Sequence, residues 1–215
     1  MERMKPKDMS LIQRLLSLDK PYFSPADLEK VLGQKRPALY VTLNRLVNYG
    51  VLKRLRRGVY QVAMQTANLP GIANQLVYPS YLSFESALSR YGILSQVPYI
   101  LTFATSQRSR QLTLGNTIVE FRQLKRELFF GYTLQNKLYV AEAEKALLDQ
   151  LYMVTRGLSS LALEDLELSP LDVERLQMYA LRFPPTVQAT VKDLIARNAS
   201  TMVDKTLPVY IPTSY

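Results

Sequence analysis

The sequence predicts an α+β protein in which an N-terminal, mostly helical domain precedes a C-terminal mixed α/β domain with a helical tail. Helical apolar spacing and strand-like runs both occur, but they are segregated, with helices first, strands in the middle and helices last. The large excess of basic over acidic residues ends near residue 62. We therefore predict domains at 1–62 and 80–215, joined by a linker at 63–79.

The first domain begins with two predicted helices. Residues 10–18 place their leucines and isoleucine on one apolar stripe behind Ser10, which we expect to cap the helix. The segment 24–27, Ser-Pro-Ala-Asp, is a start signal for a second helix, because Ser suits the cap and Pro suits the first helical position. Gly33 ends this helix, since glycine adopts positive φ at little cost.

A third helix is predicted from Pro37 to Tyr49, and its two faces differ. The apolar face, which we expect to pack into the core, carries Leu39, Leu43, Leu46 and Val47. The outer face has short or uncharged side chains with a single arginine: Pro37, Ala38, Val41, Asn44, Arg45 and Asn48. Small residues allow a helix to approach a DNA major groove closely, and Arg and Asn hydrogen-bond base edges.

A strand, a tight turn and a second strand follow Gly50, at residues 51–55, 56–58 and 59–62. Gly58 supplies the backbone freedom that the turn needs, and the turn is doubly basic. Three helices and a basic hairpin in this order are typical of a winged helix-turn-helix. The predicted DNA-binding residues are Lys35, Arg36, Ala38, Val41, Asn44, Arg45, Asn48, Lys53, Arg54, Arg56 and Arg57.

The formal net charge of +9 is concentrated in the first domain. Residues 1–62 contain 13 Lys and Arg against 5 Asp and Glu, a net charge of +8, whereas the remaining residues contain 14 against 13, a net charge of +1. Neutralising phosphates releases condensed counterions, so a concentrated positive charge favours binding to a nucleic acid. The charge and the predicted elements together indicate a protein that binds double-stranded DNA.

The chain contains no cysteine and no histidine. Disulfides, thiolate zinc sites, His-ligated metals and Ser-His-Asp or Cys-His catalysis are therefore excluded, and we predict no catalytic residue, metal or cofactor. Glu120, Glu142, Glu144 and Lys145 leave a metal-dependent nuclease as an alternative, although acidic residues in a first helical turn also suit the helix dipole. With neither a long apolar run nor a signal-peptide pattern, the sequence predicts a cytoplasmic protein without membrane contact.

The second domain is predicted to combine a small mixed sheet with helices. The expected strands are 99–104, 111–114, 117–122, 128–133 and 137–141, with a hairpin turn at Gly115-Asn116. The expected helices are 83–92, 142–153, one opening at Ser169-Pro170 and one following Pro184-Pro185, and 207–215 is expected to be extended. Arg108, Arg110, Arg122, Lys125 and Arg126 suggest a second basic strip in this domain.

Two parts of the sequence resemble the AbiEi family, the antitoxin and autorepressor component of type IV toxin–antitoxin systems of abortive infection. One is the end of the predicted hairpin, LRRGVY at residues 55–60. The other is YPSYLSFESALSRYGI at residues 78–93, with EKALLD at 144–149 in a later helix. The resemblance extends to about Tyr152 and weakens in the helical tail.

The resemblance implies a winged helix that binds inverted repeats in its own promoter, as monomers acting cooperatively. It also implies a functional partner, a nucleotidyltransferase-like toxin, which is neutralised without requiring a stable complex. A free-standing transcriptional regulator, whose second domain senses a ligand or a partner, would have the same sequence features and stays open as an alternative.

Overall fold

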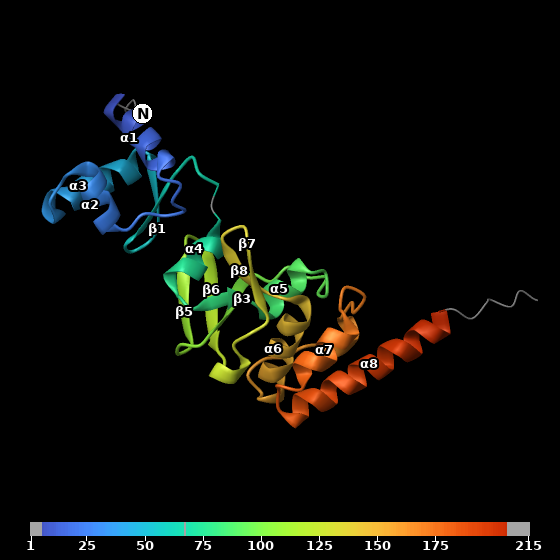
Figure 1. Cartoon of the computed structure of the whole chain (residues 1–215). Helices are drawn as coiled ribbons and strands as arrows, with labels where there is room; N and C mark the ends of the chain where they lie inside the picture. Colours follow the sequence, from blue (N-terminus) through green and yellow to red (C-terminus); the bar gives the residue numbers. More distant parts are fainter. Residues whose placement is uncertain (1–5, 67, 206–215) are drawn as a thin grey trace, which may run out of the picture. The chain divides into compact units, whose positions relative to one another are not determined.

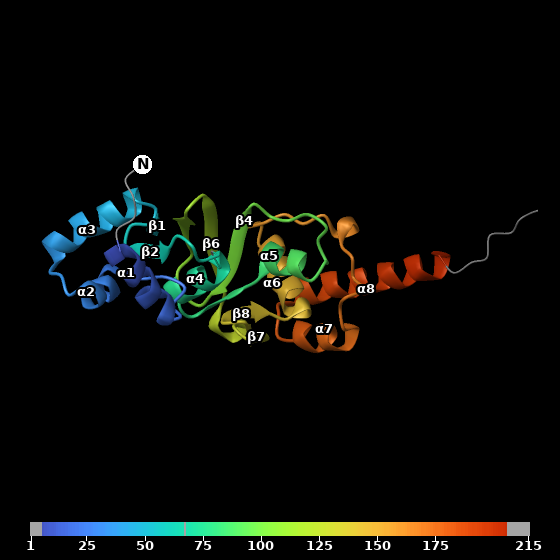
Figure 2. The ribbon, with the colours of Figure 1, turned by 90° about the horizontal axis from the view of Figure 1, so that it is seen from above.

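The computed structural model describes residues 6–66 and 68–205, and the chain divides into two units, each described here by itself (Figures 1 and 2). The first unit contains Met1–Pro79, Tyr99–Leu101 and Arg110–Glu120, and the second contains the remaining residues. The domain boundaries expected after residues 62 and 79 stay a prediction. The extended segment expected at 207–215 lies outside the described residues.

The first unit opens with the three expected helices, α1 (Pro6–Ser17), α2 (Pro25–Leu32) and α3 (Arg36–Asn48). The expected start of the first helix is wrong, because Ser10 lies inside α1 and not at its cap. Pro6 occupies the first turn, where a missing N–H costs nothing, and Asp8 places a negative charge near the positive end of the helix dipole.

A capping box fixes the start of α2, as the sequence predicts. The Ser24 hydroxyl accepts the Asp27 N–H at 3.2 Å, and the Asp27 carboxylate accepts the Ser24 N–H at 2.8 Å. At the other end, Gly33 has φ +65° and its N–H donates to the Glu29 carbonyl. Partial burial raises the pKa of Asp27, but hydrogen bonds from Lys20 and Ser24 outweigh burial and bring this pKa below the ordinary value of 3.8.

The lowered pKa of Asp27 predicts an acid-sensitive contribution to stability. A carboxyl group whose pKa is lower in the folded state stabilises the fold above its unfolded pKa, and the stabilisation is lost as the pH falls through the folded pKa. We expect Asp27→Ala to destabilise the protein near neutral pH and to approach the parent below about pH 3. Urea denaturation of both proteins across this pH range checks it, and a difference that does not change with pH would contradict it.

The hairpin consists of β1 (Leu52–Arg56) and β2 (Val59–Val62), which pair antiparallel. A register shift between Arg54 and Arg56 marks a bulge, and Gly58 in the turn has φ +79°. Phe23 adds a one-residue bridge, since its N–H donates to the Tyr60 carbonyl at 2.7 Å and its carbonyl accepts the Tyr60 N–H at 3.0 Å. This contact ties the α1–α2 connection to the wing.

A hydrophobic core joins the three helices to the wing. Its fully buried members come from every element of the winged helix-turn-helix: Ile12, Leu15, Phe23, Leu28, Leu39, Leu43, Leu46, Val51, Leu52, Tyr60 and Val62. Leu39, Leu43 and Leu46 are the expected inner face of α3, and each is 0% exposed. The wheel prediction for these three leucines is confirmed, and it leaves the opposite face of α3 in solvent.

The first unit extends beyond the hairpin. Residues 63–79 contain a helix, α4 (Leu69–Leu76), whose cap Asn68 accepts the Gly71 N–H at 3.0 Å. The turn of a second hairpin, between β5 (Arg110–Leu114) and β6 (Thr117–Gln123), lies against the wing, because the Gly115 N–H donates to the Leu55 carbonyl at 2.8 Å. The predicted turn at Gly115-Asn116 is confirmed.

Six strands form a mixed sheet in the order β5-β6-β4-β3-β8-β7. The strands not yet defined are β3 (Ser80–Leu82), β4 (Ile100–Thr105), β7 (Tyr132–Gln135) and β8 (Leu138–Ala141). β3 runs antiparallel to β4 and parallel to β8, and three residues are too few for a recognisable alternation. The strand expected at 128–133 is partly wrong, because Arg126–Leu128 forms a 3-10 turn and β7 begins at Tyr132.

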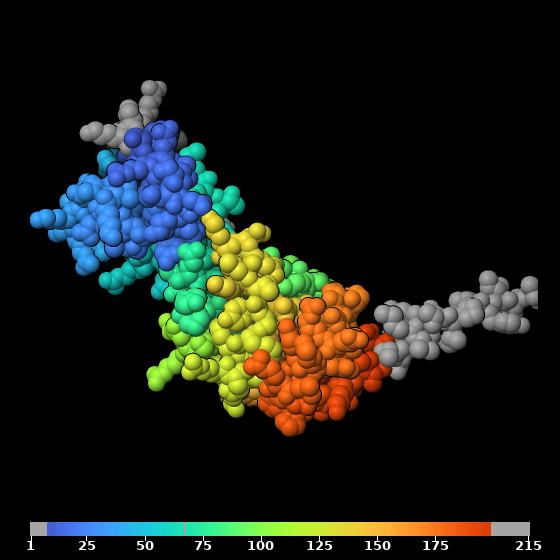
Figure 3. Space-filling model, viewed as in Figure 1, coloured from blue at the N-terminus to red at the C-terminus, as the bar shows by residue number. Residues whose placement is uncertain are grey.

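Helices complete the second unit: α5 (Phe84–Arg90), α6 (Ala143–Thr155), the 3-10 turn η2 (Leu163–Asp165), α7 (Val173–Ala180) and α8 (Pro185–Lys205). The cap expected at Ser169 is wrong, since Asp172 caps α7 by accepting the Arg175 N–H. Every residue from Glu144 to Met153 of α6 is buried. Figure 3 shows a face of the second unit on which the yellow segment that contains β7 lies next to the orange segment that contains α7. Within the described ranges, no helix has the length and apolar character needed to cross a membrane.

Candidate nucleic-acid interface

The outer face of α3 is open to solvent, as the sequence predicts. Its members are all exposed: Ala38, Val41, Asn44, Arg45 and Asn48, together with Lys35 and Arg36 at the start of the helix. Val41 is 72% exposed, which is unusual for a valine of a helix whose other face is core. No acidic residue occurs anywhere in α3. This face offers hydrogen-bond donors and small apolar groups without a repelling carboxylate.

The wing adds four exposed cations, which are Lys53, Arg54, Arg56 and Arg57. Among the described residues, these four and the pair Lys35 and Arg36 have no ion pair or side-chain hydrogen bond. Cationic side chains that lack a partner inside the folded domain have N–H groups available to bind an external anion. The structure therefore brings the predicted helix and wing residues together in one unit and leaves most of their charge unneutralised.

Arg45 differs from the other cations of this face. Its Nη2 atom lies 3.5 Å from the Asp8 Oδ1 atom, and its guanidinium carbon lies 5.8 Å from the centre of the Tyr49 ring. The Asp8 side chain is almost fully buried, whereas the Arg45 side chain is 43% exposed. These contacts orient Arg45 along α3 and tie it to α1, so a contact with DNA would start from a positioned side chain.

A groove of about 490 Å³ lies between α3 and the wing. It is lined by Tyr40, Asn44, Arg54, Arg57, Gly58 and Tyr60. Tyr40 is not among the predicted DNA-binding residues, although it precedes Asn44 by one helical turn and is 47% exposed. Its position one turn before Asn44 was a signal for the same helix face.

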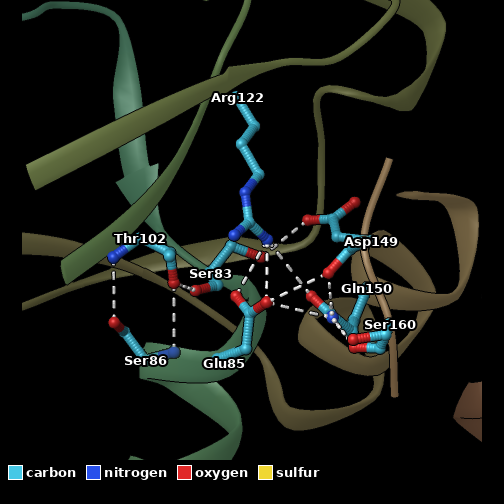
Figure 4. A network of polar contacts seen from close by, with 9 residues as sticks. Ser83, Glu85, Ser86, Thr102, Arg122, Asp149, Gln150 and Ser160 are labelled. Carbon is cyan, nitrogen blue, oxygen red and sulfur yellow. Dashed lines mark hydrogen bonds and ion pairs between the residues drawn. The ribbon is translucent and has the colours of Figure 1, made fainter. Parts of the chain in front are cut away.

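A second polar cluster lies inside the second unit, and Figure 4 shows part of it. Lys145 and Asp149, one turn apart on α6, form an ion pair in which both side chains are 0% exposed. Asp149 also accepts the Tyr81 hydroxyl at 3.0 Å and the Ser83 hydroxyl at 2.8 Å. Burial lowers the pKa of Lys145 and raises that of Asp149, against the opposing effect of each partner's charge. Burial and then Asp149 raise the pKa of Tyr81.

The suggested second basic strip is not a set of free cations. Arg122 donates to both carboxylate oxygens of Glu85, at 3.0 and 2.8 Å, and Figure 4 shows the two side chains facing each other. The Gln150 amide also donates to Glu85, at 3.1 Å. Lys125 lies 3.9 Å from Glu127. The contact with Glu85 neutralises the charge of Arg122 within the second unit, whereas Lys125 and Glu127 form only an exposed pair.

Glu142 and Glu144, two of the residues that suggested a nuclease, contact α7 and its cap. The Glu142 carboxylate accepts the Tyr179 hydroxyl at 2.5 Å, and the Glu144 carboxylate accepts the Asp172 N–H at 2.8 Å. Lys145 is paired with Asp149 as described above. The described residues contain no group of three or more acidic side chains arranged to hold a metal ion.

The chain resembles known proteins in its fold and, over its N-terminal part, in its sequence. No curated protein matches the sequence significantly. The Rv2827c protein of Mycobacterium tuberculosis has a similar crystal structure, with a TM-score of 0.62 over 98% of this chain and 85% of that chain. The two sequences are 17% identical, so this likeness concerns the fold alone.

A sequence family matches the part of the chain that contains α3 and the wing. Residues 10–63 match the model of a family described as transcriptional regulator, AbiEi antitoxin. The matched segment begins within α1 and ends just after β2, so it spans α2, α3 and both strands of the wing. The N-terminal part of this chain is therefore similar in sequence to the AbiEi antitoxin family of transcriptional regulators.

Proposed function

We propose that this protein is a sequence-specific double-stranded DNA-binding repressor that acts as the antitoxin of a type IV toxin–antitoxin system and regulates its own promoter. In this role it is a binding protein and not an enzyme. The DNA would be contacted by Lys35, Arg36 and Arg45 at phosphates or guanine edges, and by Asn44 and Asn48 at bases. Ala38 or Val41 would lie against thymine methyl groups, and Arg54, Arg56 and Arg57 would hold the wing on the backbone.

The observation that carries this proposal is the unpaired charge on the outer face of α3 and on the wing. Six cations of these elements have no partner within the described residues, and the helix face between them has no acidic side chain. A helix of this kind fits a major groove, and a basic hairpin fits the adjacent backbone or minor groove. The family match of residues 10–63 supports the same assignment.

A footprint on the DNA upstream of the protein's own gene tests the proposal. We expect protection of inverted repeats, with cooperative filling of the two half-sites by monomers. A random-sequence duplex serves as the control, and protection there at the same protein concentration would remove the claim of specificity. Transcription from the same promoter, measured with and without the protein, tests autoregulation separately.

Arg45→Ala is expected to change the order of preference among operator variants. An arginine that bonds a guanine edge contributes about 1–3 kcal/mol of discrimination at one base pair. Because Asp8 and Tyr49 position this side chain, its loss should affect one position and leave the others unchanged. Competition binding with single-base variants measures this, and an unchanged order of preference would make Arg45 a phosphate contact.

The antitoxin role rests on the family description, and the neighbouring gene tests it. A downstream gene for a nucleotidyltransferase-like protein, whose toxicity is relieved by co-expression of this chain, is the expected result. Relief without co-purification fits neutralisation that needs no stable complex. If no such gene is present, a free-standing regulator with a ligand- or partner-sensing second unit becomes the better assignment.

A further inference from the structure

The register of the hairpin explains why Arg54 of the wing lines the groove beside α3. Side chains alternate along a strand, so Leu52 and Arg54 project from the same face of β1. Leu52 is 2% exposed in the core beneath α3, whereas Arg54, two residues further along, is exposed. Arg54 also pairs with Tyr60 across the hairpin, and directly opposed residues share a face. The wing therefore directs Arg54 toward the side on which α3 lies.

The helix supplies the other wall of the groove. Tyr40 and Asn44 are one turn apart on α3, so their side chains lie on the same face of the helix. Tyr40 is 47% exposed, whereas Tyr60, which also lines the groove, is only 2% exposed.

The polar groups of the groove suit an anion. Its lining residues carry two guanidinium groups, from Arg54 and Arg57, two phenol groups and one amide, but no carboxylate. Neither arginine nor Tyr40 has a polar partner among the residues that the structure describes. Guanidinium groups present paired donors whose spacing matches two oxygens of a phosphate.

We propose that this groove binds one phosphodiester group of the DNA strand that passes between α3 and the wing, and that Tyr40 is a further DNA-binding residue. Arg54 and Arg57 bond the charged oxygens, and the Tyr40 hydroxyl donates a third hydrogen bond from the helix side. The helix and the wing thereby contact the same phosphate. This shared contact fixes how far α3 enters the major groove. The inference rests on the proposed DNA binding and adds a site to it.

Salt-dependent binding to a short random-sequence duplex tests the site in the full chain, because phosphate contacts do not require the operator. We expect Tyr40→Phe to lower the affinity about tenfold, since a hydrogen bond to a charged group is lost. The slope of log K against log salt should not change, because a neutral hydroxyl displaces no counterion. Arg54→Ala with Arg57→Ala should instead reduce that slope by nearly 2.

Coupling between the two walls gives the sharper measurement. In the Arg54→Ala, Arg57→Ala background, Tyr40→Phe should have little further effect, because the phosphate is no longer held in the groove. Tyr99→Phe is the matched control, since Tyr99 is 99% exposed, does not line the groove and should bind as the parent does. Arg54→Lys with Arg57→Lys should keep the salt slope and lose part of the affinity, because lysine lacks the paired donors.

The possible outcomes distinguish a failure of the proposed phosphate site from a failure of the proposed DNA binding. If the parent binds duplex DNA but Tyr40→Phe binds equally well, the groove does not hold a phosphate in the proposed way and DNA binding stands. If the effects of Tyr40→Phe and of the arginine pair are simply additive, they contact different groups and the shared site is wrong. If the parent binds neither the random duplex nor its own upstream DNA, the proposed function fails and the site fails with it.

Discussion

Asp149→Ala is expected to lower the free energy of unfolding of the second unit by about 3–5 kcal/mol, because it would leave Lys145 as an unpaired charge in the core. The Lys145 ammonium lies 5.1 Å from the centre of the Phe130 ring and 5.3 Å from that of Phe183. Both members of the pair are fully buried, so water cannot replace the lost carboxylate without opening the packing around α6. The substitution also removes the acceptor of the Tyr81 and Ser83 hydroxyl groups.

Urea denaturation of the full chain and hydrogen exchange of the α6 amides measure this effect. Asp193→Ala, on the exposed side of α8, is the matched control and should change stability by less than about 0.5 kcal/mol. A double substitution to apolar residues, Lys145→Met with Asp149→Leu, should recover much of the loss, because it removes both charges together. A double variant as unstable as Asp149→Ala would show that the lost charge pairing is not the cause.

Arg56→Ala combined with Arg57→Ala is expected to weaken binding to duplexes of every sequence by roughly 50-fold at about 0.1 M salt. Each lost phosphate contact lowers the salt slope by about 0.9, so the slope should fall by nearly 2. The order of preference among operator variants should stay the same, since backbone contacts do not read the sequence. Both side chains are exposed and have no partner among the described residues, so the fold should not depend on them.

The control must remove the same charge from elsewhere. Lys30→Ala with Lys192→Ala also lowers the net charge by two, at exposed positions on α2 and α8. If this control weakens binding as strongly as the wing variant, the effect comes from net charge and the wing has no special role. Circular dichroism of both variants should match the parent, which excludes unfolding as the reason for weaker binding.

Local signals in the sequence predicted the winged helix-turn-helix well, because its elements begin and end at residues with strong backbone preferences. The capping box of Ser24 and Asp27 and the positive φ at Gly33 and Gly58 each depend on a few neighbouring residues. The buried leucines of α3 follow from helical spacing alone. The exposure of the predicted DNA-binding residues of α3 follows from the same spacing, since a residue away from the core face of this helix faces solvent.

Features that depend on distant residues were missed or placed wrongly. β3 has three residues and becomes a strand only because β4 and β8 lie on either side of it. The start of α7 at Asp172 competed with an equally plausible signal at Ser169-Pro170. The burial of the polar residues of EKALLD in α6 was not predicted, because the aromatic side chains and the Tyr81 hydroxyl that surround them come from distant segments.

The sequence by itself determined the helix and wing order of the first unit, the concentration of positive charge there and the outer face of α3, because composition and spacing are local properties. Only the tertiary structure decided which of those charges remain unpaired. Asp8 lies 37 residues from Arg45, and Glu85 lies 37 residues from Arg122, so folding alone brings each carboxylate to its arginine. The same is true of Tyr40, Arg54 and Arg57, which form one groove only because the hairpin packs against α3.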